Sequence, residues 1–255
     1  FSEQYSRALI TERSDEAVQA AIRNDPDYAF AYYVRGIHYF FRRKQFREGL
    51  EDFQHALELE PDNPILVAAI GKGAFVTGDF ERAIAQYQEA LVMDPVFPEF
   101  HWFLGNAYMS DKRFDEAEAT FRKLIDLSPD SYGNADLWEA LLLQGELEEA
   151  LARSDSSFAR AVTQYALGNR DAADAALAEL RQSDSGYYIA MVYAYRGDAD
   201  KAFEWLYRVI EIRDAFYTFI LTENAFESVH ADERWSQLME RLDLTEYWEA
   251  MDKAQ

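Results

Sequence analysis

The sequence repeats with a period of 34 residues, and this feature constrains the fold more than any other. Three segments share one outline and begin at residues 44, 78 and 112: KQFREGLEDFQHALELEP, GDFERAIAQYQEALVMDP and KRFDEAEATFRKLIDLSP. Their matching columns hold an aromatic residue, a small residue, a second aromatic residue and a proline: Phe46, Phe80, Phe114; Gly49, Ala83, Ala117; Phe53, Tyr87, Phe121; Pro61, Pro95, Pro129. A fixed period of this length indicates that similar units stack side by side.

Each unit has the pattern of two helices that cross. A further column of glycines, Gly36, Gly71 and Gly105, lies ahead of each of the segments above. Small residues let two helix backbones approach, and large residues fill the space beside the crossing. Each proline stands where a helix must end, because proline cannot continue the ladder of hydrogen bonds. The columns therefore predict one packed antiparallel helix pair per repeat.

This column pattern resembles the tetratricopeptide repeat. The resemblance implies an all-α fold, a right-handed superhelical solenoid of antiparallel helix pairs with a C-terminal capping helix. It also implies four parts along the chain. These are a degenerate leading repeat or N-terminal cap at 1–28, three strong units at 29–129, degenerate units at 130–214 and a capping segment at 215–255. Within the degenerate part, the second helix of the fourth unit is expected to be cut short near Ser154 and Asp155.

The C-terminal segment departs from the period. AFESVHADERWSQLMERLDL, residues 225 to 244, predicts a short loop, a cap at Asp232, and a helix that carries Trp235, Leu238 and Leu242. A stack of repeats needs such an atypical final helix to cover its exposed end. The segment is also similar to the end of tetratricopeptide regions in bacterial winged-helix regulators, adenylate cyclases and serine/threonine kinases. This resemblance implies the regulatory or sensory part of a larger bacterial protein.

Charge and composition limit the partners. The net charge is −22, which repels phosphate backbones, so we expect no binding to nucleic acid and favour partners with basic or apolar faces. No apolar run approaches the roughly 18 residues of a membrane span, so membrane insertion is not expected. The sequence begins at Phe1 without a methionine, which suggests a piece of a longer protein. Cytoplasm and periplasm both remain open as compartments, because a chain without cysteine is compatible with either.

Motifs of catalysis are absent from the sequence. The four histidines are widely separated, and no H-E-x-x-H or G-x-S-x-G pattern occurs. Gly71-Lys72-Gly73 lacks the upstream glycine and the following Ser or Thr of a phosphate loop. We therefore expect no catalytic residue, no metal and no cofactor, and predict that the chain is not an enzyme. An enzyme whose active site lies outside this segment remains an alternative.

The resemblance implies that the first helix of each pair lines a concave groove. The side chains at the groove positions are mostly apolar and largely aromatic. In order along the chain they are Phe30, Tyr33, Ile37, Phe40, Phe41, Lys72, Phe75, Trp102, Asn106 and Met109. Burying one such ring contributes roughly 1.5–3 kcal/mol, so a few rings could anchor a helix or an extended peptide. The sequence thus predicts a module that binds an apolar or amphipathic segment of a protein or peptide.

The binding mode of the groove and two alternatives to a free groove remain to be considered. The family's carboxylate clamp is not expected, because Tyr33 and Ile37 occupy the columns of its first lysine and asparagine. The leading helix, residues 3 to 23, could instead cover Phe30 and its neighbours. A homodimer is the other alternative, in which aromatic residues of the degenerate units form a symmetric face: Tyr187, Tyr188, Tyr193 and Trp205.

Overall fold

The computed structural model describes residues 2–40, 45–129, 133–183, 186–211 and 220–254. Over these residues the chain is built of helices and contains no strand, as the repeat predicted. The chain divides into two compact units. Unit 1 comprises residues 1–77 and 82–95, and unit 2 comprises residues 78–81 and 96–255. None of the described helices is both long and apolar enough to cross a membrane.

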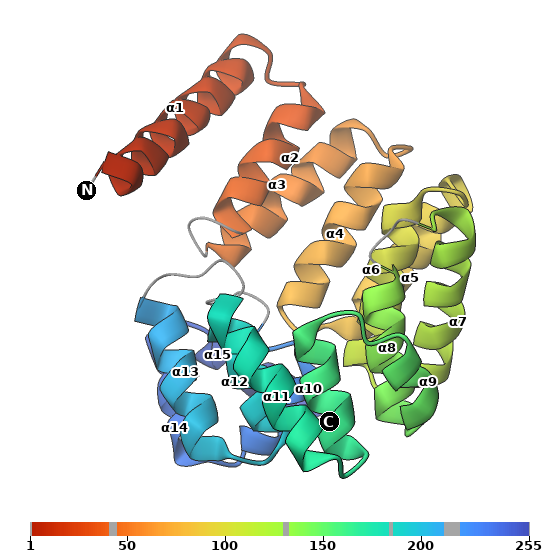
Figure 1. Cartoon of the computed structure of the whole chain (residues 1–255). Coiled ribbons are helices and arrows are strands. Elements are labelled where there is room, and N and C mark those ends of the chain that lie inside the picture. The colour runs from red at the N-terminus through yellow and green to blue at the C-terminus, as the bar shows by residue number, and fades with distance from the viewer. Residues whose placement is uncertain (1, 41–44, 130–132, 184–185, 212–219, 255) are drawn as a thin grey trace. The chain divides into compact units, whose positions relative to one another are not determined.

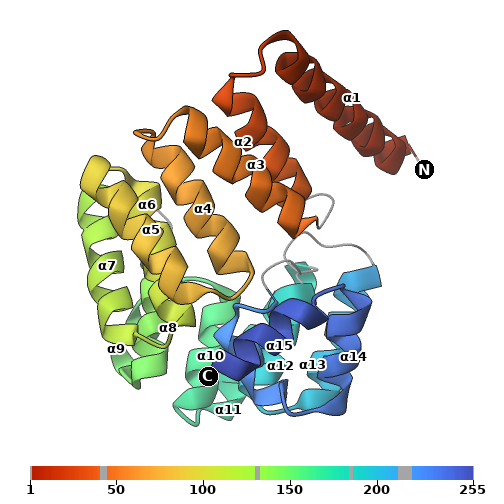
Figure 2. The same cartoon turned by 180° about the vertical axis from the view of Figure 1, so that it is seen from behind.

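Unit 1 is a stack of helix pairs that follows a long leading helix (Figure 1, Figure 2). Its helices are α1 (Ser2–Asn24), α2 (Ala29–His38), α3 (Phe46–Leu59), α4 (Pro64–Val76) and most of α5 (Phe80–Met93). At the crossing of α2 and α3, a methyl group on Gly36 would lie 2.6 Å from the ring of Phe53. A methyl group on Gly71 would likewise lie 2.8 Å from Tyr87 of α5. The small columns of the sequence are thus the points of closest helix approach.

Polar contacts fix the helices of unit 1 to one another. Arg35 of α2 donates two hydrogen bonds to Asp52 of α3, from Nε to Oδ2 at 2.7 Å and from Nη2 to Oδ1 at 2.6 Å. His38, buried near the end of α2, lies with its Nδ1 2.7 Å from Oδ1 of Asp15 on α1. The leading helix is therefore held to α2 by a specific polar contact.

Unit 2 continues the pattern of helix pairs with shorter and less regular members. Its elements are α6 (Pro98–Ser110), α7 (Phe114–Leu127), α8 (Gly133–Gln144), α9 (Leu147–Ala152), α10 (Ser157–Ala166), α11 (Arg170–Leu180), η2 (Arg181–Ser183), α12 (Gly186–Tyr195), α13 (Ala199–Glu211), η4 (Asn224–Val229), α14 (Glu233–Arg241) and α15 (Thr245–Ala254). The short α9 ends at Ala152, which agrees with the predicted shortening near Ser154.

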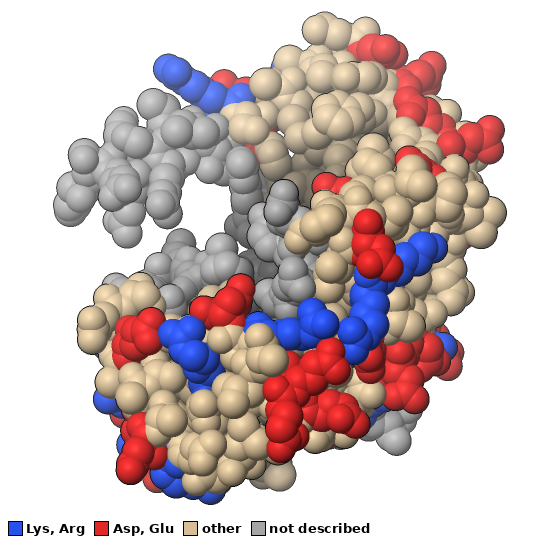
Figure 3. Space-filling view, turned by 45° about the vertical axis from the view of Figure 1, so that its right-hand side comes forward, with Lys and Arg blue, Asp and Glu red and all other residues tan. Residues whose placement is uncertain are grey.

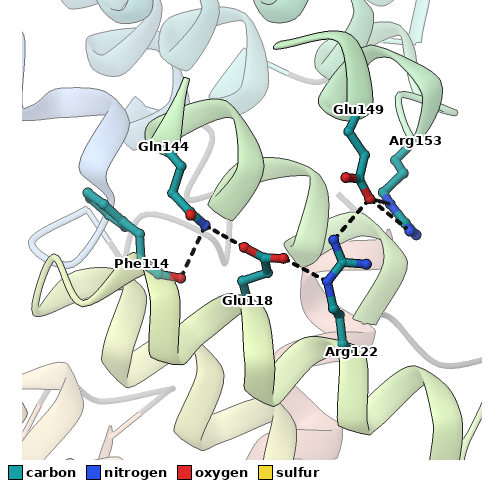
Figure 4. Close-up of polar contacts among 6 residues, drawn as sticks. All are labelled: Phe114, Glu118, Arg122, Gln144, Glu149 and Arg153. Carbon is teal, nitrogen blue, oxygen red and sulfur yellow. Dashed lines mark hydrogen bonds and ion pairs between the residues drawn. The ribbon is translucent and has the colours of Figure 1, made fainter. Parts of the chain in front are cut away.

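A chain of side-chain contacts joins α7 to α8 and α9 (Figure 4). Gln144 of α8 donates to Glu118 of α7 at 3.0 Å, and Arg122 of α7 donates to the same carboxylate at 2.7 Å. Arg122 also donates to Glu149 of α9 at 3.0 Å, and Arg153 donates to Glu149 at 3.2 Å. The charged groups keep about a quarter to less than half of their side-chain surface exposed to water, so each ion pair contributes little to stability. Their effect is to align successive helix pairs.

In the C-terminal segment, the predicted cap and helix are confirmed, the expected short loop contains the 3-10 helix η4, and α15 is an additional helix. Asp232 caps α14 by accepting a hydrogen bond from the backbone nitrogen of Arg234 at 3.0 Å. Trp235, Leu238 and Leu242 of this segment are buried. The ring of Trp248 on α15 lies 5.7 Å from the ring of Trp235. Both helices therefore pack through an aromatic cluster.

Candidate partner-binding surfaces

An exposed apolar patch lies at the starts of α2 and α4 in unit 1. We call Tyr28, Phe30 and Ile65 the α2–α4 patch; these side chains are 45%, 55% and 45% exposed. The ring of Phe30 lies 6.1 Å from Tyr28 and 5.9 Å from Tyr33. Tyr33 in turn packs on the buried cluster formed by Ala29 of α2, Ala56 of α3 and Leu66 of α4. The patch is therefore continuous with the core, which holds its rings in place.

Carboxylates border the α2–α4 patch. The loop before α2 and the loop before α4 each carry two exposed acidic residues: Asp25 and Asp27, and Glu60 and Asp62. Asn63 caps α4 by accepting from the backbone nitrogen of Ile65 at 3.1 Å, and its amide donates to Glu60 at 2.7 Å. The same loop that starts α4 therefore sets a negative charge beside Ile65.

The remaining groove positions of unit 1 differ in accessibility. Tyr33, Ile37, Lys72 and Phe75 are half-buried. Burial raises the pKa of the Tyr33 phenol and lowers the pKa of the Lys72 ammonium group. Phe41 lies outside the described residues.

Phe40 was expected to line the groove, but it lies in the core instead. Its ring is fully buried and stacks on Phe53 at 5.3 Å and 13°. Tyr39 and Phe40 form a π-helical turn, which accommodates one extra residue within a helix. This first unit also has one more residue between Tyr39 and Phe46 than the next unit has between Ala74 and Phe80. The insertion turns Phe40 away from the face that the regular period assigns to it.

The leading helix leaves part of the patch accessible. α1 packs along α2, where Ser14 and Asp15 contact His38. Phe30, the second residue of α2, nevertheless keeps 55% of its surface exposed. In this structure the leading helix therefore does not cover Phe30.

In unit 2, the groove positions form part of a polar network. Trp102 of α6 donates from Nε1 to Oδ2 of Asp136 on α8 at 2.6 Å. Asn106 donates to the carbonyl oxygen of Trp102 at 2.9 Å. Both side chains are half-buried, so they retain accessible surface. Met109, in contrast, is buried, and its carbonyl oxygen accepts from Asn224 at 3.2 Å.

Three carboxylates with raised pKa values lie in this network. Burial raises the pKa of Asp136 to about 7 despite its hydrogen bond from Trp102. Glu139 accepts from the hydroxyl of Tyr195 at 2.6 Å, and burial raises its pKa as well. Burial raises the pKa of Glu223 to about 8, with the charges of Glu139 and Asp136 adding to the effect. These groups are close enough that their ionisations oppose one another.

These three carboxylates were not singled out in the sequence. The repeat spacing could have identified Glu139. Gly145 stands 33 residues after Lys112, the start of the third repeated segment, and Glu139 stands 33 residues after Asn106, so both are shifted by the same distance. Glu139 thus continues the groove column of Lys72 and Asn106 into the fourth unit. A carboxylate at this groove position indicates that Glu139 does not belong to the solvated outer surface.

The C-terminal segment covers part of the first helices of unit 2. Ser110 at the end of α6 donates to the carbonyl oxygen of Thr222 at 2.9 Å, and Ser228 donates to the carbonyl oxygen of Ala194 on α12 at 2.7 Å. Ile220 and Leu221 are buried in this packing. This cover explains why Met109 is inaccessible.

The aromatic residues of the degenerate units serve mainly the interior. Tyr187 and Tyr193 are buried, while Tyr188 and Trp205 are half-buried. Tyr188 packs on Phe158 of α10 with ring centroids 5.1 Å apart. Two of the four rings considered for a dimer face are therefore part of the fold of unit 2 itself. Within the described part of the chain, no three His, Asp or Glu side chains are grouped so that they could hold a metal ion.

Comparison with known proteins agrees with the repeat pattern. Residues 68–132 match the model of a family described as tetratricopeptide repeat. The small glutamine-rich tetratricopeptide repeat-containing protein 2 of Mycosarcoma maydis is 29% identical over 132 residues. These are 52% of this chain and 35% of that relative, so the chain spans well under half of its length.

Two solved structures share the fold. A tetratricopeptide repeat protein from Parabacteroides merdae superposes with a TM-score of 0.64 at 15% identity and covers 96% of both chains. PilF of Pseudomonas aeruginosa superposes with a TM-score of 0.59 at 18% identity, over 73% of this chain and 90% of that chain. At these identities the similarity concerns the fold alone.

Residues 68–132 thus match the tetratricopeptide repeat, and the stacked helix pairs have the fold of tetratricopeptide-repeat proteins.

Proposed function

We propose that this module docks an apolar segment of a partner protein, flanked by Lys or Arg, on the α2–α4 patch of unit 1. The observation that carries the proposal is the exposure of Phe30, at 55%, beside the ring of Tyr28, together with the exposure of Ile65 at the start of α4. Aromatic side chains at an accessible site are the usual anchors of a protein interface. Charge selects the partner, because the patch is bordered by carboxylates and the chain carries −22 overall.

The wider surface supports the same choice of partner. Acidic side chains predominate over the face shown in Figure 3, and basic side chains occur there in small groups. Such a field attracts cationic segments and repels anionic ones, which raises the rate of productive encounter. Trp102 and Asn106 of unit 2 supply a second accessible contact beside the carboxylate of Asp136.

The proposal includes a role for this chain within a larger protein. The similarity of residues 225–244 to the ends of bacterial regulatory tetratricopeptide regions supports a regulatory part of a larger bacterial protein. In that role, partner docking would report to a neighbouring domain. An apolar segment flanked by Lys or Arg would dock in the same way, whether it belonged to the larger protein itself or to a separate partner.

A defined peptide pair tests the docking proposal. One peptide is a 14-residue Leu/Lys sequence with its leucines at helical spacing, and the other has the same composition with the leucines dispersed. We expect fluorescence anisotropy to show saturable binding of the first peptide only. The double variant Phe30→Ala/Ile65→Ala should bind about tenfold or more weakly, because burial of a large apolar side chain contributes about 1.5–3 kcal/mol.

Val92→Ala is the matched control, since Val92 lies on α5 and is 84% exposed. It removes an exposed apolar side chain of the same unit outside α2 and α4. Equal binding by the native protein, the double variant and the control would rule out the α2–α4 patch. Equal binding of the two peptides would show attraction by charge alone.

A further inference from the structure

A cavity of about 370 Å³ lies in unit 2. Its wall is formed by α11, the end of α12 and the start of α13. Three cationic side chains reach it on a chain that is strongly acidic overall: Arg181, Arg196 and Lys201. The turn between α12 and α13 passes through Gly197, whose φ of +72° favours glycine. This turn brings Arg196 and Lys201 to one cavity.

Arg196 lines the cavity, and two of its guanidinium nitrogens have no hydrogen-bond acceptor within the described part of the chain. Its side chain is 10% exposed, and its guanidinium lies 5.0 Å from the ring centre of Tyr165. Nη1 donates to Oδ1 of Asp174 at 2.7 Å. Nε and Nη2 are buried and have no acceptor within the described part of the chain. A buried donor without a partner costs about 1–3 kcal/mol, so an acceptor that reached this group would be strongly favoured.

Arg181 and Lys201 both lie near the ring of Tyr193. Arg181 donates to the hydroxyl of Tyr193, and Nζ of Lys201 lies 5.2 Å from the centre of the same ring. A hydrogen bond to Asp198 at 2.6 Å is the main cause that raises the pKa of Lys201, and the positive charge of Arg181 acts against it. Two like charges thus lie at one ring, and Asp198 pairs with Lys201.

The carboxylates at this site are accessible to water. Asp198 is about one-third exposed and its partner Lys201 is 52% exposed, and an ion pair in such a position contributes about 0–1 kcal/mol. Asp174 is 71% exposed, although its partner Arg196 is largely buried. Water and a dissolved anion can therefore reach both carboxylates, and an anion with more oxygen atoms could compete with each of them for its cation.

We propose that this cavity binds a phosphate monoester. A phosphoryl group has three terminal oxygens, which suits a cavity lined by three cations, and Arg recognises it by paired hydrogen bonds. Arg196 reaches the ligand when its guanidinium turns from Asp174, which also gives Nε and Nη2 an acceptor. Leu177, Ala178 and the ring of Tyr193 provide an apolar wall for the organic part of the ester. The volume lies in the range of about 300–1,000 Å³ that is usual for small-molecule sites.

Isothermal titration calorimetry with the full chain tests the proposal. The probes are phenyl phosphate, inorganic phosphate and benzoate. We expect saturable binding of phenyl phosphate, weaker binding of inorganic phosphate because it leaves the apolar wall empty, and no binding of benzoate. A capped phosphotyrosine serves as a further probe. It should bind more tightly than phenyl phosphate if the natural ligand is a phosphorylated side chain, and no more tightly if it is a small ester.

Variants of exposed residues separate the site from general electrostatics. Lys201→Gln and Arg181→Gln should each weaken phenyl phosphate binding about tenfold, as for a lost hydrogen bond between charged groups. Lys123→Gln, which removes an exposed cation from α7 of the same unit, should leave binding unchanged. Asp174→Asn should strengthen binding severalfold, because it frees Arg196 and removes a like charge.

Two results would overturn the proposal. One is the absence of saturable phenyl phosphate binding at millimolar concentration. The other is an equal affinity of Lys201→Gln, Arg181→Gln and Lys123→Gln.

Discussion

The indole nitrogen of Trp102 donates a 2.6 Å hydrogen bond to the carboxylate of Asp136. The bond joins α6 to α8, the first helices of two successive pairs in unit 2. It combines two properties that the sequence pattern treated separately, an aromatic groove position and an acidic surface. Because Asp136 has lost much of its hydration, this one donor is an important part of what still stabilises its charge.

Replacing Trp102 by phenylalanine should destabilise the protein mainly when Asp136 is ionised. The substitution keeps an aromatic ring and removes the donor. A hydrogen bond to a charged group contributes about 1.5–3 kcal/mol, so we expect a loss of about that size at pH 8.5. At pH 5, where Asp136 is protonated, the loss should be smaller. Urea unfolding at both pH values measures the difference.

Trp205→Phe is the control for this substitution, since Trp205 is also half-buried and lies on α13 of the same unit. It should lose the same stability at both pH values. A loss for Trp102→Phe that does not depend on pH would mean that the ring, rather than the hydrogen bond, is what matters.

Stability should fall as the pH rises from 5 to 8. The unfolded chain releases the protons of Asp and Glu near pH 4, whereas the folded chain holds them on Asp136 and Glu223 until about pH 7 and 8. The folded state therefore binds more protons in this window, and its advantage is lost with rising pH. Asp232 acts in the opposite direction, because Arg234 holds its pKa near 2, but it is fully ionised throughout this window. Chemical unfolding across the range should show a decrease on the order of a few kcal/mol.

Glu139→Gln isolates the buried carboxylates from other pH effects. The glutamine oxygen can still accept from the hydroxyl of Tyr195, while one of the three opposing charges is removed. We expect higher stability than the native protein at pH 8, little change at pH 5 and a flatter profile between them. Glu148→Gln, an exposed position on α9, should leave the profile unchanged. Parallel profiles for native protein and Glu139→Gln would refute the assignment.

The helix pairs could be predicted from sequence because a single local rule generates them. A glycine or alanine at each crossing and a proline at each end recur at fixed distance, so the period alone places Gly71 against Tyr87. The cap at Asp232 followed from an acceptor side chain at the start of a helix. These features depend on residues that are close in sequence or one period apart.

The accessible surface could be predicted only in part, because it depends on exceptions to the period. One inserted residue turned Phe40 into the core. The packing of residues 220–224 against α6, more than a hundred positions away in sequence, covered Met109. The 34-residue period predicts neither the inserted residue nor this long-range packing. Phe30 and Trp102 remain candidate contacts because no such exception reaches them.

The pair Arg35 and Asp52 in unit 1 should contribute strongly to stability only as long as both partners are present. Asp52 is buried and receives both of its hydrogen bonds from one guanidinium. Arg35→Met leaves a buried carboxylate without its partner, and we expect a loss of about 3 kcal/mol, at the low end for a broken buried pair because Arg35 is partly exposed. Arg35→Met/Asp52→Leu should recover most of this loss. Urea unfolding of the two single variants and the double variant gives the coupling energy. A double variant as unstable as Arg35→Met would show that packing, rather than the buried charge, causes the loss.

A methyl group at Gly105 should disrupt unit 2 by overpacking. The Cβ of an alanine at this position would overlap the ring of Phe121, where α6 crosses α7. Overpacking of a dense interior costs about 1–3 kcal/mol, and we expect Gly105→Ala to lower the thermal midpoint accordingly. Phe121→Leu alone should also destabilise, because it leaves unfilled space beside Gly105. The double variant Gly105→Ala/Phe121→Leu should be more stable than the sum of the two changes predicts, because the smaller side chain makes room for the methyl group. Strict additivity in thermal melts would mean that the backbones of α6 and α7 move apart freely, and that the glycine column does not set their distance.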